Sequence, residues 1–125
     1  MKLFSFFAGI FLLTVSADGG CNKKKSSEIY KGRLEIKALC MNYTIKVLEG
    51  NIDTSLISAS WTDESTNKDY TNVFGLASKC TFPSDIKEGD EFYFVLDDSA
   101  RRDCAVCLAY YPVPSKKLMI KVVEK

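Results

Sequence analysis

Short runs of alternating apolar and polar residues cover most of this chain, and this period of two constrains its fold more than any other feature. Alternation of this kind is typical of half-buried β-strands rather than helices. Stretches rich in Gly, Pro, Asp, Asn or Ser separate the runs. We therefore predict six strands, at residues 33–48, 57–62, 70–77, 92–96, 107–111 and 118–123.

The first of these runs changes phase between Cys40 and Asn42. Leu34 and Ile36 fall on one face before the change, whereas Tyr43 begins a new apolar series after it. Such a phase change predicts a β-bulge or a sharp bend within one long strand. Residues 83–89 begin with a proline and end with a glycine, so we expect a short helical turn there.

These elements predict an all-β fold that forms one domain over residues 30–125. A small antiparallel barrel, OB-like, with about six strands and one short helical turn, fits a bent first strand best. A small β-sandwich is the alternative. A domain of this size buries only a modest core, so disulfides are expected to support it.

The N-terminal residues have the order of a secretory signal peptide. Lys2 precedes an uncharged apolar stretch, residues 3–13, and small residues follow at 15–17. The stretch is shorter than the ~20 residues that a membrane-spanning helix needs. Cleavage after Ala17 would release a soluble secreted protein, whereas cleavage after Gly20 would place Cys21 at the new N-terminus. We predict a signal peptide over residues 1–20 and a polar tether over residues 21–29.

The chain has five cysteines, an odd number for an exported protein. If Cys21 carries a lipid, four remain as disulfide candidates: Cys40, Cys80, Cys104 and Cys107. Among the three possible pairings we favour Cys40 with Cys80 and Cys104 with Cys107, and crossed pairings stay open. The Cys-x-x-Cys motif at Cys104 and Cys107 also allows a thiol-redox centre or part of a zinc site.

The signal peptide, Cys21 and the Lys- and Ser-rich residues 22–27 resemble the N-termini of small lipoproteins of Bacteroidota-type bacteria. The resemblance implies a localisation and no activity. It implies a protein of the periplasm or outer membrane, anchored in the membrane through a lipid on Cys21. The soluble secreted form is the alternative.

Several classes of function find no support in the sequence. The chain contains no histidine, which removes the commonest general base and metal ligand. Its 17 Lys and Arg nearly balance 16 Asp and Glu, which argues against a nucleic-acid partner. No paired carboxylates, phosphate-binding loop or calcium loop can be recognised. We expect a non-enzymatic protein without catalytic residues, metal or cofactor.

Aromatic residues are abundant enough that some are expected to remain outside the core as a binding surface. The candidates are Trp61, Tyr93, Tyr110 and Tyr111. We therefore expect a binding or adaptor module for an envelope protein or a glycan. An inhibitor of a hydrolase such as lysozyme or a protease is the alternative, with residues 63–69 or 97–103 as the inserting loop. A redox or zinc protein using Cys104 and Cys107 is a third hypothesis.

Overall fold

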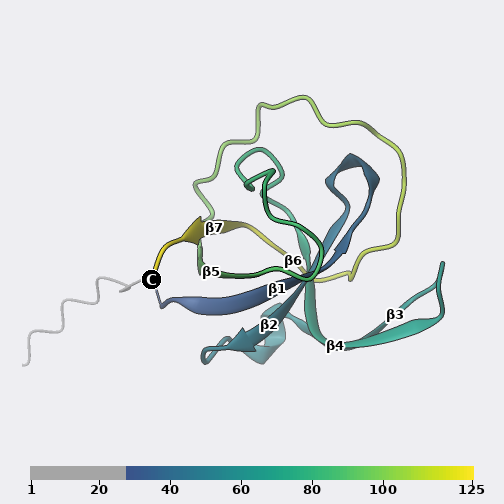
Figure 1. Ribbon diagram of the computed structural model, residues 1–125, viewed down its shortest axis with the longest axis horizontal. Helices are drawn as coiled ribbons and strands as arrows, with labels where there is room; N and C mark the ends of the chain where they lie inside the picture. Colours follow the sequence, from purple (N-terminus) through teal and green to yellow (C-terminus); the bar gives the residue numbers. More distant parts are fainter. Residues whose placement is uncertain (1–27) are drawn as a thin grey trace, which may run out of the picture.

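The computed structural model describes residues 28–125, which form a single β-sheet with two short 3₁₀ turns (Figure 1). The all-β prediction is confirmed, although the structure has seven strands where the sequence predicted six. In chain order the elements are β1 (Tyr30–Lys37), η1 (Leu39–Met41), β2 (Tyr43–Glu49), η2 (Thr54–Leu56), β3 (Ser58–Asp63), β4 (Lys68–Leu76), β5 (Glu91–Leu96), β6 (Lys117–Leu118) and β7 (Ile120–Val123).

The strand order β3-β4-β2-β1-β5-β7 curls the sheet into a partly open barrel. Only Met119 separates β6 from β7, yet the two strands have different partners. β6 pairs in parallel with β4, while β7 pairs antiparallel with β5. β6 and β7 thereby connect the two sides of the sheet without a continuous ladder, so the barrel is not closed. The end of the β3–β4 hairpin extends away from the barrel (Figure 1).

The predicted bent first strand is wrong: it is an antiparallel hairpin of β1 and β2. Cys40 and Met41 both adopt positive φ angles, 57° and 56°, which reverse the chain at η1. A reversal and a bulge produce the same change of phase in the sequence, so alternation alone could not distinguish them.

Two other local predictions also fail. Residues 83–89 form turns rather than a helix, and the 3₁₀ turns occur instead at η1 and η2. The strand predicted at residues 107–111 is irregular and belongs to a long loop, residues 97–116, between β5 and β6. In Figure 1 this loop arches over one end of the barrel. Pro112 and Pro114 lack the N–H groups that a ladder needs, which is consistent with its irregular backbone.

Aromatic rings fill the centre of the barrel. Phe94 of β5 is fully buried, and its ring centroid lies 5.7 Å from that of Phe74 and 6.0 Å from that of Phe92. Phe92 in turn contacts Phe82, whose ring meets Tyr43 edge to face at 5.6 Å. These contacts connect β2, β4, β5 and the 77–90 connection into one core.

A glycine in β1 allows this packing. A Cβ atom on Gly32 would lie 2.9 Å from Cε1 of Phe94 and 3.2 Å from Cγ2 of Ile45. Only a residue without a side chain therefore lets the Phe94 ring lie against the β1 backbone. The β1–β2 register also shifts between Lys31 and Gly32, where the strand bends around the core.

Candidate functional site: a segment held by two disulfides

Two disulfides fix the 97–116 loop to the barrel. Cys104 is bonded to Cys80, with their Cα atoms 5.4 Å apart, and Cys107 is bonded to Cys40 across 5.0 Å. The pairing favoured from the sequence is wrong, and the crossed alternative is correct. The loop crosses from the turn at Cys80 to η1, so each of its cysteines meets a different partner.

This pairing removes the support for a redox centre or a zinc site. The Cys-x-x-Cys motif does not close on itself, because Cys104 and Cys107 are each bonded to a distant cysteine. All four thiols are consumed, whereas zinc binds thiolates. Within residues 28–125 no group of His, Cys, Asp and Glu side chains is arranged to hold a metal ion.

Hydrogen bonds hold the next residues of the loop. The side-chain amide of Asn42 donates to the carbonyl oxygens of Ala109, at 2.9 Å, and of Leu39, at 3.0 Å. Two residues further on, the Tyr111 hydroxyl donates to Oδ2 of Asp63 at 2.7 Å and lies 2.8 Å from the Ser65 hydroxyl oxygen. We call residues 104–111 the pinned segment, since Cys104, Cys107, Ala109 and Tyr111 each attach it to the barrel or to the β3–β4 hairpin.

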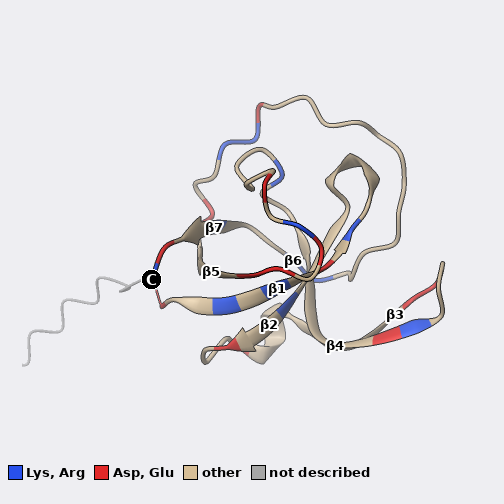
Figure 2. Cartoon of the chain, viewed as in Figure 1, with Lys and Arg blue, Asp and Glu red and all other residues tan. Residues whose placement is uncertain are grey.

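Between these attachments the pinned segment exposes apolar side chains. Leu108 is 98% exposed and Tyr110 is 80% exposed, far more than any other large apolar residue that the structure describes. We call this pair the apolar ridge. Figure 2 shows that the rest of the loop up to residue 115 carries no charge, in contrast to the Arg- and Asp-containing part before Cys104. This exposed apolar pair on a fixed, uncharged segment is the candidate contact surface of the molecule.

The hydrogen bonds that attach the pinned segment at Asp63 change the pKa of the Asp63 carboxyl group. Asp63 is only 1% exposed, and this burial by itself would raise the pKa of its carboxyl group. Hydrogen bonds from Tyr111 and from the Ser65 hydroxyl and backbone N–H outweigh the burial and lower the pKa below its ordinary value of 3.8. The ionised form of Asp63 is therefore the form that holds the segment.

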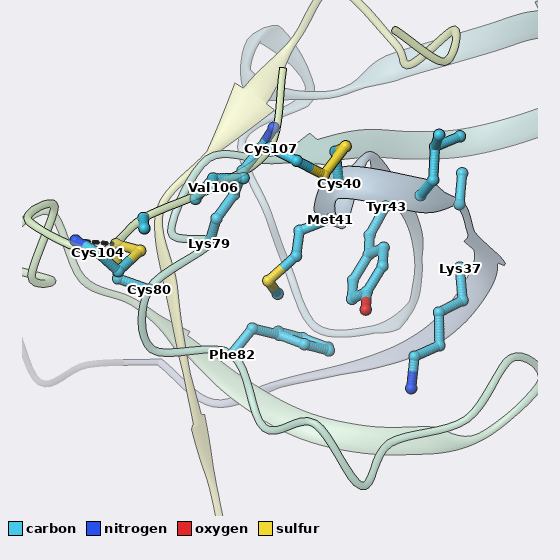
Figure 3. A pocket seen from close by; sticks show the side chains of 13 residues that line it. Lys37, Cys40, Met41, Tyr43, Lys79, Cys80, Phe82, Cys104, Val106 and Cys107 are labelled. Atoms are coloured by element: carbon cyan, nitrogen blue, oxygen red, sulfur yellow. Dashed lines mark hydrogen bonds between the residues drawn. A yellow bond between two sulfur atoms is a disulfide. The ribbon is translucent and has the colours of Figure 1, made fainter. Parts of the chain in front are cut away.

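A cleft of about 720 Å³ lies beside the pinned segment, and both disulfides contribute to its wall (Figure 3). Met41, Tyr43 and Phe82 form its apolar part. Lys37 and Lys79 add positive charge, and no carboxylate lines the cleft. Both ammonium groups contact neutral oxygens, Lys37 the carbonyls of the 84–86 turn and Lys79 the Asn42 amide, so their charges remain uncompensated by these contacts.

The four aromatic residues predicted to form a binding surface lie on three segments: Trp61 on β3, Tyr93 on β5, and Tyr110 and Tyr111 on the pinned segment. Tyr110 is exposed as predicted, but Tyr111 is half-buried in its contact with Asp63. Trp61 packs against Tyr70 on the β3–β4 hairpin at 5.7 Å. Tyr93 lies on β5 between the ammonium groups of Lys31 and Lys125. The exposure of Leu108 was not predicted from the sequence, although the nearby Pro112 indicates a loop rather than a strand.

The proposed inserting loops have local structure of their own. Residues 63–69 include the tight turn between β3 and β4, in which Asp63 accepts from Ser65. In residues 97–103 Asp97 accepts from Ser99, and Arg101 pairs with Asp103 at 3.1 Å on the surface. The candidate lipidation site, Cys21, lies outside the described residues.

Comparison with known proteins adds no assignment: no family model, curated protein or solved structure matches the chain. Among residues 28–125 there is no helix of the length and apolar character that crossing a membrane requires.

We expect the two disulfides to contribute unequally to stability. Cys40 and Cys107 are 67 residues apart and Cys80 and Cys104 are 24 apart, so the first cross-link restricts the unfolded chain more. Each should contribute about 2–4 kcal/mol, and the Cys40→Ser/Cys107→Ser variant should lose roughly 1 kcal/mol more than Cys80→Ser/Cys104→Ser. Urea unfolding of both double variants measures this difference, and the reverse order would contradict it.

We also expect a pH-dependent contribution from Asp63. Because its folded pKa is lowered, its contribution to stability is complete above the ordinary pKa of 3.8 and is lost as pH falls through the folded value. Asp63→Asn should cost about 1–3 kcal/mol at pH 6, since it weakens hydrogen bonds to a buried group. The difference from the unmodified protein should shrink by pH 2.5. Asp98→Asn, at an exposed loop position, is the control, and a difference independent of pH would refute the assignment.

Proposed function

We propose that this protein is an exported, non-enzymatic binding module that contacts an envelope protein through the apolar ridge. The observation that carries the proposal is the 98% exposure of Leu108 on a segment that two disulfides hold in place. Free energy is gained when such a side chain leaves water, and fixing the segment in advance lowers the entropic cost of binding.

The chemistry of the ridge favours a protein over a glycan as the partner. Glycan recognition depends on polar side chains that hydrogen-bond hydroxyl groups, together with aromatic faces. The pinned segment has few polar side chains, and one of them, the Tyr111 hydroxyl, is already engaged by Asp63 and Ser65. Leucine and tyrosine beside an uncharged backbone instead resemble the apolar centre of a protein interface.

The cleft fits the same proposal. Val106 and Cys107 belong to both the pinned segment and the cleft wall, so a partner seated on the ridge could extend into the cleft. Lys37 and Lys79 would then favour a partner with an acidic group at that edge.

The membrane anchor is a second part of the proposal. Two disulfides indicate an oxidising, extracytoplasmic compartment. They use four of the five cysteines, which leaves Cys21 without a disulfide partner inside the chain. We propose that Cys21 carries a lipid that anchors the protein in the membrane and that residues 22–27 are the tether. The protein would then lie in the periplasm or at the outer membrane.

Intact-mass measurement on protein from the host membrane fraction tests the anchor. We expect a diacyl or triacyl increment on a chain that begins at Cys21. The four remaining cysteines should be alkylated only after reduction. A chain without lipid that begins at Asp18 would refute the anchor and support the soluble secreted form.

Site-specific photo-crosslinking in the host tests the contact surface. A photoreactive residue at position 108 or 110 should form an adduct with the same envelope protein. A photoreactive residue at position 121, an exposed site on β7, is the control and should not. Equal adducts at position 121, no protein adduct at 108, or adducts with phospholipid alone would each refute a protein contact through the ridge.

A further inference from the structure

We propose that the pinned segment is an inhibitory loop that occupies the substrate cleft of an endopeptidase, with Leu108 in the primary specificity pocket. This inference rests on the proposed function, because it names the class of protein that the apolar ridge binds. It also moves the inhibitor hypothesis away from residues 63–69 and 97–103, since neither of those loops presents an exposed apolar side chain between fixed points.

The backbone of the pinned segment is available to a peptidase. Substrate clefts bind peptides largely through main-chain hydrogen bonds of the kind that add a strand to a sheet. From Ala105 to Leu108 no backbone N–H or carbonyl forms a hydrogen bond within the described residues. No residue from 104 to 111 has a positive φ, so no left-handed turn interrupts the segment.

The segment is also held as an inhibitory loop needs to be. Inhibitors of peptidases bind tightly through interfaces of ordinary size, because their contact loops change little on binding. Here Cys107 is attached covalently immediately before Leu108, and the Ala109 carbonyl is held by Asn42 immediately after it. Leu108 is therefore displayed between two adjacent fixed residues.

The side chain of Leu108 matches one class of primary pocket. At 98% exposure it can enter a pocket without any rearrangement of its neighbours. A hydrophobic pocket at that position selects apolar residues, whereas a pocket with a buried carboxylate selects Lys or Arg. The segment carries no charge, so we assign its target to endopeptidases that cleave after large apolar residues.

The attachments explain why cleavage would not release the enzyme. Hydrolysis of the Leu108–Ala109 bond would consume one water and form a carboxylate on Leu108 and an amine on Ala109. Both new ends would stay in place, because Cys40 holds Cys107 on one side while Asn42 and Asp63 hold Ala109 and Tyr111 on the other. The amine would remain next to the acyl carbon, so the bond can re-form with loss of the same water and the complex persists.

Inhibition assays with a transfer of specificity test the inference. The folded, disulfide-bonded protein should inhibit a chymotrypsin-type or a subtilisin-type endopeptidase stoichiometrically. Leu108→Gly should weaken that inhibition at least 100-fold. Leu108→Arg should lose it as well and should gain inhibition of trypsin, whose pocket selects Arg. Ile29→Arg changes another exposed aliphatic residue outside the segment and should behave as the unmodified protein.

The Cys40→Ser/Cys107→Ser variant supplies a second readout. Without this attachment the Leu108 end is held only from Cys104 and moves away from Ala109 after hydrolysis, so the variant should be cut after Leu108 and enzyme activity should return. The inference is wrong if the unmodified protein is itself cut rapidly with return of activity. It is also wrong if neither the unmodified protein nor Leu108→Arg inhibits its matched enzyme. In either case, crosslinking at position 108 to an envelope protein would leave the proposed binding function intact.

Discussion

The Cys40–Cys107 disulfide is the constraint on which the functional surface depends. It joins the turn of the β1–β2 hairpin to the middle of a loop that has no regular secondary structure. The loop spans residues 97–116, and ordering so long a segment costs conformational entropy that its own few hydrogen bonds cannot offset. The cross-link removes most of that freedom, and the contacts of Asn42 and Asp63 with Ala109 and Tyr111 then fix the orientation of the residues beside it.

The strands expected at 57–62, 70–77 and 92–96 correspond closely to β3, β4 and β5. Burial alternates along β5 as the sequence pattern predicted, whereas in β4 the buried residues are consecutive at its C-terminal end. Prediction failed at Cys40, where the change of phase came from a reversal of the chain. It also failed at residues 107–111, where the alternating pattern reflects attachment and exposure rather than a ladder of hydrogen bonds.

The site was less predictable than the fold because its geometry is long-range. The four cysteines could be recognised as a disulfide set, but their pairing depends on which turns the barrel brings together. Tyr110 was predicted to be exposed, as it is, whereas Leu108 was not considered. Only the disulfide to η1 shows that Cys107 is fixed in place immediately before Leu108, which faces solvent.

The hydrophobic core and the apolar ridge consist of different residues, and this affects which substitutions the protein tolerates. No residue of the pinned segment belongs to the hydrophobic core, and the fully buried member of its loop, Pro114, packs near Gly75 of β4. Side chains at positions 108 and 110 therefore contribute little to the stability of the barrel. Their exposure instead leaves apolar area whose removal from water would favour a complex. Different residues stabilise the barrel and form the contact surface, so substitutions in the apolar ridge need no compensating change in the core.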